Sequence, residues 1–275
     1  MDVYDHCAAI VRELDRDRYV ADLFAAESGR RHLFALHAFS AEVARIRDTV
    51  SEPTLGEVRL QWWRDALISG GGGHPVAGAL IETVRAFALP LAAFEGLIDA
   101  RSFDLYDDQV PTLTDLEGYA GETASALIQL GAIVLAGGRD PQVASAAGHA
   151  GVAYAMTGLL RALPIHAVRG QCYLPADIGA AHGFDRDMLA RGAATPELMA
   201  TLAELRGIAR GHLARAMPEI AALPAALKPA FLPVALVAPA LDRMERAGYD
   251  PFSGRIDLTP LRRQWILWRA ARRWR

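Results

Sequence analysis

The 275-residue sequence predicts an all-α fold, with one helical domain spanning residues 1–275. No stretch alternates apolar and polar residues as a strand does, whereas apolar residues recur at the three- and four-residue spacing of a helix. Apolar residues make up 52% of the chain, enough for a large core at a length near the upper limit for one core. No repeat or flexible linker divides the chain, so a helical bundle is the simplest architecture.

The first long helix is predicted from about residue 31 to just before Pro53. Pro53 ends it, because the residue before a proline is displaced from the helical region. Residues 54–57 then form a capping-box pattern that opens the next helix. The buried stripe of the first helix consists of Leu36, Phe39, Val43, Ile46 and Val50.

A glycine-rich connection at residues 69–75 follows, without the Lys-Ser/Thr of a phosphate-binding loop. Proline, glycine and polar clusters separate the remaining apolar-periodic segments. Helices are accordingly predicted around residues 79–88, 90–106, 114–136, 142–163, 195–217, 225–246 and 259–273.

Charge and cysteine content exclude several classes of protein. A net charge of −3 gives no reason to expect nucleic-acid binding, and Cys7 and Cys172 form neither a disulfide framework nor a zinc motif. The most apolar stretch, residues 221–241, contains four prolines and Lys228, unlike the roughly 20 uninterrupted apolar residues of a membrane span. We expect a cytoplasmic chain, or one peripheral to the inner membrane.

Two carboxylates stand near the end of the first predicted helix. Asp48 and Glu52 lie four residues apart, which on a continuous helix points both the same way, together with Arg45 and His37. Such a pair can hold Mg²⁺ and, through it, the phosphates of a substrate. The alternative is a solvated Arg45–Asp48 ion pair that contributes about 0.2–0.5 kcal/mol, and spacing alone favours this alternative.

A second pair of carboxylates four residues apart, Asp104 and Asp108, precedes Pro111. One interpretation is a substitute metal site. The favoured one is a charged helix end beside a turn, which needs no ligand to explain it. His166 is a further candidate, as a catalytic base, but spacing identifies no partner for it.

The last predicted helix combines arginine with tryptophan, with six arginines in residues 262–275. Its apolar residues recur at helical spacing and predict a stripe that docks on the core. The surplus arginines instead predict contact with an anionic membrane surface, and the two roles can coexist. The predicted stripe consists of Leu258, Leu261, Trp265 and Trp268.

Two segments resemble the squalene/phytoene synthase family. They are RYVADLFAAESGRRHLFALHAFSAEVARIRDTVSEPTLGEVRLQWWRDAL and TGLLRALPIHAVRGQCYLP. The resemblance implies an isoprenoid synthase fold with a central cavity and a head-to-head condensation of two prenyl diphosphates. It also implies two acidic motifs on facing helices that hold Mg²⁺.

Residue by residue, Asp48 and Glu52 match the ends of the first acidic motif and are thereby implied as metal ligands. Tyr119 matches a family tyrosine on a central helix, and Tyr119 and Arg161 are the candidate catalytic residues. The implied substrate- and diphosphate-binding residues are Arg45, Arg161, Arg169 and Tyr173.

The second acidic motif departs from the family pattern. Ala162 and His166 stand where the family has two aspartates, and Pro164 between them predicts a break in the helix. Alanine ligates nothing, and neutral imidazole is a poor ligand for Mg²⁺. Loss of a metal-binding carboxylate pair is expected to lower the rate by several orders of magnitude.

The segment FDLYDDQVPTL and the C-terminal region resemble the family branch that contains the mitochondrial complex I assembly factor and its bacterial relatives. This resemblance implies a noncatalytic pseudoenzyme, without a cofactor, that assists respiratory-complex assembly or binds an isoprenoid or lipid. A pure interaction scaffold with a filled cavity is a third class. The alternative is a prenyl (farnesyl or geranylgeranyl) diphosphate transferase that uses Mg²⁺ at Asp48, Glu52, Asp104 and Asp108.

Overall fold

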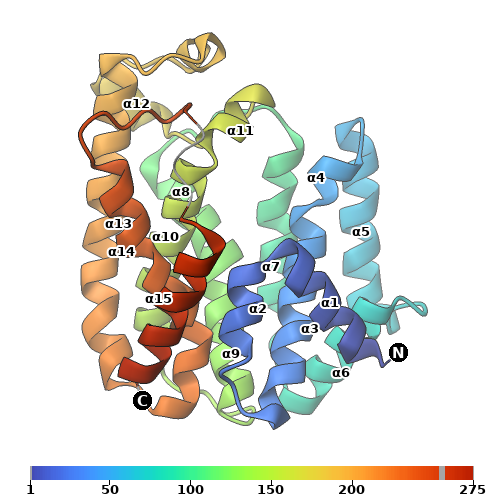
Figure 1. The fold of residues 1–275 in the computed structure, drawn as a ribbon. Helices are drawn as coiled ribbons and strands as arrows, with labels where there is room; N and C mark the ends of the chain where they lie inside the picture. Colours follow the sequence, from blue (N-terminus) through green and yellow to red (C-terminus); the bar gives the residue numbers. More distant parts are fainter. Residues whose placement is uncertain (1, 254–257, 275) are drawn as a thin grey trace.

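A computed structural model describes residues 2–253 and 258–274, and within them it is helical without a strand. The predicted all-α fold is therefore confirmed. The helices lie mostly side by side, with the N-terminal half of the chain at the right of Figure 1 and the C-terminal half at the left.

The N-terminal half contains α1 (Val3–Leu14), α2 (Arg16–Asp22), α3 (Glu27–Ala44), α4 (Ile46–Thr49), α5 (Pro53–Ser69), α6 (Pro75–Phe87), α7 (Leu91–Ser102) and the 3₁₀ turn η1 (Phe103–Leu105). The centre contains α8 (Leu113–Ala120), the π-helical turn η2 (Gly121–Ser125), α9 (Ala126–Leu135), α10 (Ala144–Arg161), α11 (Leu163–Val168) and α12 (Ala176–Ala181). The C-terminal part contains η3 (Arg186–Arg191), α13 (Pro196–Ala222), η4 (Ala225–Leu236), α14 (Val237–Met244) and α15 (Pro260–Arg273).

The first long helix is shorter than the sequence predicts. It ends at Ala44, and after the separate turn α4 the backbone is extended at Val50 and again at Glu52. The predicted capping box at residues 54–57 is also wrong, because α5 begins at Pro53 with Glu52 as its N-cap and no side-chain cap. Proline is well suited to the first turn of a helix, since its missing N–H would have no helical partner there.

Two large clusters of buried side chains form the core. One lies among α1, α3, α5, α6, α7 and α9, and the other among α8, α10, α13, η4 and α14. Helix α10 approaches η2 closely at Gly151, where an added Cβ would lie 2.4 Å from backbone atoms of Ser125. This packing fixes α8, which precedes η2, against α10.

A third, smaller cluster joins α2, η4 and α15. The buried side of α15 carries Leu267 and Ala270, whereas Leu261 is 79% exposed, Trp265 53% and Trp268 43%. The predicted docking stripe on this helix is therefore wrong, apart from Leu258, which is buried just before the helix begins.

Among the described residues, one helical stretch, Ala225–Met244, is long and apolar enough to cross a membrane. Its most apolar window is 61% buried inside the fold, as in a core helix, and Phe231 is fully buried. The prolines Pro229 and Pro233 lie inside η4, so the first part of this stretch forms 3₁₀ turns.

Candidate functional site

The site is organised around the break between α10 and α11. Arg161 is the last residue of α10, Ala162 is the residue between the two helices, and Pro164 lies in the first turn of α11. The break predicted at Pro164 is therefore confirmed. After α11 the chain turns at Gly170 (φ +74°), and Gln171 and Tyr173 return to the centre of the molecule.

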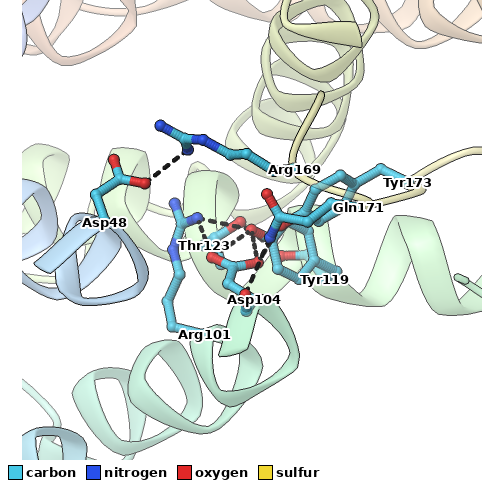
Figure 2. A network of polar contacts seen from close by, with 8 residues as sticks. All are labelled: Asp48, Arg101, Asp104, Tyr119, Thr123, Arg169, Gln171 and Tyr173. Carbon is cyan, nitrogen blue, oxygen red and sulfur yellow. Dashed lines mark hydrogen bonds and ion pairs between the residues drawn. The ribbon is translucent and has the colours of Figure 1, made fainter. Parts of the chain in front are cut away.

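Asp104 is the centre of a buried hydrogen-bond network (Figure 2). Its carboxylate accepts hydrogen bonds from Arg101 Nη1 at 2.8 Å, Tyr119 OH at 2.9 Å and Tyr173 OH at 2.6 Å. Gln171 Nε2 donates to the backbone carbonyl of Asp104 at 3.0 Å, and Arg101 Nη1 also donates to Tyr119 OH at 2.6 Å. The network thus joins the end of α7, η1, α8 and the loop after α11.

Burial determines the protonation states in this network. It raises the pKa of both Tyr119 and Tyr173, and the neighbouring Asp104 carboxylate raises them further. For Arg101, burial alone would lower the pKa, but the contacts with Tyr119 and Asp104 outweigh it and raise the pKa. Both phenols therefore stay neutral donors and the guanidinium stays charged, so the buried Asp104 carboxylate is balanced by the partly buried Arg101 cation.

An ion pair joins Asp48 of the first acidic motif to Arg169, which follows the altered second motif. Arg169 Nη1 lies 2.6 Å from Asp48 Oδ1, and the pair is drawn at the left of Figure 2. Each of these side chains is more than 40% exposed. His166 packs against the ring of Tyr173, with 4.6 Å between ring centroids, and burial lowers its pKa to about 4. The imidazole is therefore neutral at pH 7.

Two of the sequence-predicted residues lie apart from this group. Glu52 is exposed, and because the helix ends before it, it does not share a helical face with Asp48 as the spacing predicted. Arg45 lines a separate depression of about 320 Å³ beside Trp62 and His74.

A central cavity of about 190 Å³ lies beside the network. Tyr119 and Arg161 both line it, and the rest of the lining comes from α2, α7, η2, α10, η4 and α14. A second hollow of about 450 Å³ under α15 shares Asp17, Tyr154 and Arg161 with it. Arg161 therefore stands where the two spaces adjoin.

The donor set around the α10–α11 break does not fit Mg²⁺, which requires oxygen ligands in near-octahedral geometry. Asp48 is the carboxylate facing the break, and an arginine already neutralises it. The Asp104 carboxylate already accepts hydrogen bonds from three side chains, and Asp108 is exposed at the surface. Among the residues that the structure describes, no three His, Cys, Asp or Glu side chains are grouped to hold a metal ion.

The sequence does not reveal the two charged residues at the centre of this network. No sequence pattern singles out Arg101, and the pattern around Asp104 favours a charged helix end, whereas Asp104 is only 6% exposed. The spacing of Arg101 and Asp104, three apart on a helix, is a signal for an ion pair. It does not indicate burial, which depends on Tyr119 and Tyr173 from distant parts of the chain.

Comparison with known proteins identifies relatives of this chain. The squalene/phytoene synthase family model matches residues 11–265. The NADH dehydrogenase (ubiquinone) complex I assembly factor 6 of Bos taurus is 32% identical, covering 90% of this chain and 75% of the relative. The human counterpart is 30% identical, with coverage of 90% and 76%. The chloroplastic phytoene synthase of Daucus carota is 24% identical, with coverage of 92% and 66%.

Solved structures share the fold. A dehydrosqualene synthase in complex with a ligand superposes with a TM-score of 0.84 at 19% identity, covering 98% of this chain and 96% of that chain. A squalene synthase from Alicyclobacillus acidocaldarius gives a TM-score of 0.79 at 20% identity, with coverage of 91% and 95%. At such identities the likeness concerns the fold alone, because one fold hosts many functions.

Proposed function

This chain belongs to the squalene/phytoene synthase family, and from that premise we propose that it is a noncatalytic member that assists assembly of a respiratory complex. The observation that carries the proposal is the ion pair between Asp48 and Arg169. A cation of the protein itself neutralises the carboxylate that would face a metal, and the facing positions are Ala162 and His166. Among the described residues no second carboxylate pair faces Asp48, which supports the loss of a Mg²⁺-mediated grip on a diphosphate.

The assembly role is supported by the relatives at about 30% identity, which are named as complex I assembly factors and match over most of their length. We propose in addition that the central cavity holds part of an isoprenoid or lipid. A space beside Tyr119 and Arg161 favours this over a scaffold with a filled interior. Its volume of about 190 Å³ is below the roughly 300–1,000 Å³ of most small-molecule sites, so a bound chain would extend into the adjoining hollow.

The first test measures turnover. Purified protein with Mg²⁺ and farnesyl or geranylgeranyl diphosphate should give no squalene- or phytoene-type product. The double variant Ala162→Asp/His166→Asp, combined with Arg169→Gln to release Asp48, should bind Mg²⁺ and diphosphate more tightly than the wild type. Product formation by the unmodified protein would support the alternative, a Mg²⁺-dependent prenyl transferase.

The second test separates assembly from catalysis in the organism that carries this chain. Loss of the chain should lower the amount of assembled NADH dehydrogenase complex. Asp48→Asn should restore assembly as well as the wild type does, because the proposed role needs no metal ligand. Failure of Asp48→Asn to restore it, with the variant present at normal levels, would argue that a metal-dependent activity is required.

We also propose that the chain works at an anionic membrane surface through α15. The outward stripe of this helix carries Leu261, Trp265 and Trp268, and the helix has five arginines and no acidic residue. Arg272 lies over the ring of Trp268 at 3.9 Å, which places a cation beside an exposed aromatic ring. Interfacial helices combine such residues in this way.

Binding to lipid vesicles tests whether α15 contacts a membrane. The double variant Trp265→Ala/Trp268→Ala should keep its fold, because Trp265 is 53% and Trp268 43% exposed and neither belongs to a buried cluster. It should bind vesicles containing phosphatidylglycerol more weakly than the wild type. Trp62→Ala is the control, since Trp62 is 40% exposed on α5, outside α15. Equal vesicle binding by wild type and double variant would exclude this face as the contact.

A further inference from the structure

A groove of about 460 Å³ runs between α15 and the surface formed by α13, η4 and α14. It shares no lining residue with the central cavity beside Tyr119. Its volume lies within the range of about 300–1,000 Å³ that small-molecule sites occupy. Its apolar floor consists of Leu213, Met217, Val234, Ala235, Ala238 and Ile266.

The lining of this groove carries a marked excess of positive charge. Among the residues that the structure describes, five arginines and one carboxylate, Asp242, line it. That carboxylate lies 2.7 Å from Arg210 Nη2, a cation outside the lining that also pairs with Glu245. Within residues 2–253 and 258–274, no carboxylate pairs with four of the five, which are Arg246, Arg262, Arg269 and Arg273.

The groove adjoins the exposed stripe of α15. Trp265 belongs to both, and Arg269 lies over its ring at 5.1 Å. A molecule in the groove would therefore be in contact with a membrane on which the stripe lay. An apolar floor below a cationic rim is complementary to an amphiphile with an anionic head, because the rim pairs with the head and the floor shields the chain from water.

We propose that this groove binds a single anionic phospholipid, with the phosphodiester between the rim arginines and the start of an acyl chain on the floor. The inference rests on the proposed membrane contact of α15 and adds a defined lipid site to it. Free phosphate would satisfy the rim but leave the floor in contact with water. Lipid and free phosphate share the phosphate chemistry, and the experiment distinguishes them.

The probe is dihexanoyl phosphatidylglycerol below its critical micelle concentration, measured by isothermal titration against the full-length protein. We expect saturable binding with one molecule per chain, and binding of dihexanoyl phosphatidylcholine at least about tenfold weaker, a difference of about 1.4 kcal/mol. Inorganic phosphate should bind far more weakly than the phosphatidylglycerol. Equal binding of phosphate and lipid would overturn the amphiphile site and leave a simple anion site.

Two variants locate the site. Arg246→Gln/Arg269→Gln should weaken binding by about thirtyfold, since each basic residue near an anionic head contributes on the order of a fivefold gain in affinity. Ala238→Trp should abolish binding by filling the floor, with a melting curve to verify folding. The matched control for charge is Arg85→Gln/Arg191→Gln, which removes two exposed arginines outside the groove. Unchanged binding by the Arg246/Arg269 variant would place the lipid elsewhere.

The proposed lipid site in the groove and the proposed membrane contact of α15 can be disproved independently. Trp268 does not line the groove, so Trp268→Ala should weaken vesicle binding and leave the affinity for the monomeric short-chain lipid within about twofold of wild type. Vesicle binding without short-chain lipid binding would disprove the groove site and leave the membrane contact intact. Short-chain binding without vesicle binding would disprove the membrane contact alone.

Discussion

At the scale of single residues, the buried carboxylate of Asp104 determines how the centre of the site is arranged. Three donors from α7, α8 and the loop after α11 meet on it, and one of them, Arg101, is a cation whose side chain is only 21% exposed. Removing one member of a buried ion pair is more damaging than removing both, because the remaining charge has no counterpart in a medium of low polarity.

We predict that Asp104→Asn lowers the free energy of unfolding by about 3 kcal/mol, because Arg101 loses its counter-charge and an amide N–H₂ faces the tyrosine hydroxyls. The control is Asp107→Asn, the same change three residues later. Asp107 is 61% exposed and lies 3.5 Å from Arg47, so its loss should change stability by less than about 0.5 kcal/mol. Urea unfolding of both variants checks this, and equal costs would contradict the central role of Asp104.

His166 should make stability depend on pH. Burial lowers its pKa from 6.5 to about 4, so between these values the unfolded chain binds a proton that the folded chain does not. Falling pH therefore favours unfolding across that window, and the stabilisation that is complete above pH 6.5 is lost by about pH 4.

We predict that His166→Phe, which keeps a ring against Tyr173, removes this dependence. Wild type should lose about 2–3 kcal/mol more than the variant between pH 6.5 and 4. Urea unfolding at several pH values measures the free energy of unfolding of both proteins. The titration of carboxylates is common to both and cancels when the two values are subtracted. Parallel stability profiles would show that His166 titrates normally in the folded protein.

The sequence predicts some residues of this site but not the burial of Asp104, and the difference has a physical reason. Tyr119, Arg161 and Tyr173 were identified through the family resemblance, and the structure brings Tyr119 and Tyr173 together on Asp104. Spacing alone could not show that Asp104 is buried, because its burial depends on side chains that are 15 and 69 residues away. Long-range contacts of this kind leave no local pattern.

At the scale of elements, the main error concerned the end of α3. Apolar periodicity continues through Ile46 to Val50 and predicts one helix, whereas the helix ends at Ala44. The stripe itself is correct as far as Ile46, which is buried at 5% exposure. Pro53 accounts for the extended backbone of Glu52, because the residue before a proline is displaced from the helical region. Glu52 therefore cannot lie on the same helix as Asp48.

The crossing of α10 over η2 yields a prediction at the same scale. A Cβ at Gly151 would lie 2.4 Å from the backbone of Ser125, and backbone atoms cannot move aside as a side chain can. On the same helix, Gly148 has open space at that position. Ser125 Oγ donates to the Gly148 carbonyl at 2.9 Å, and a Cβ at Gly151 would also collide with this hydroxyl oxygen.

We predict that Gly151→Ala destabilises the protein by more than about 2 kcal/mol through overpacking, and that α8 and Tyr119 shift with it. Gly148→Ala should instead stabilise by about 0.5–1 kcal/mol, because alanine is the better helix former. Thermal or urea unfolding compares the two. A tolerated Gly151→Ala would mean that α10 and η2 do not cross as closely as the structure has them.

At the scale of the whole molecule, the last helix closes the fold onto one of the first. Arg263 of α15 and Asp17 of α2 form an ion pair between residues 246 positions apart, with 2.8 Å from Nε to Oδ1. Leu267 then fills the cluster between α2 and η4. The sequence predicts that this helix docks on the core, and the structure shows that it does so through Leu267 and Ala270, on a different face from the predicted one.

Leucine substitutions on the two faces of α15 test this closure. Leu267 is 1% exposed, so we predict that Leu267→Ala lowers the free energy of unfolding by about 2–4 kcal/mol, the usual cost of a leucine cavity. Because α2 contacts the same cluster, its amides should exchange faster with solvent in this variant. Leu261→Ala, the same change at a residue 79% exposed, should cost less than about 0.5 kcal/mol. Similar costs at both positions would mean that α15 is a detachable membrane helix rather than part of the core.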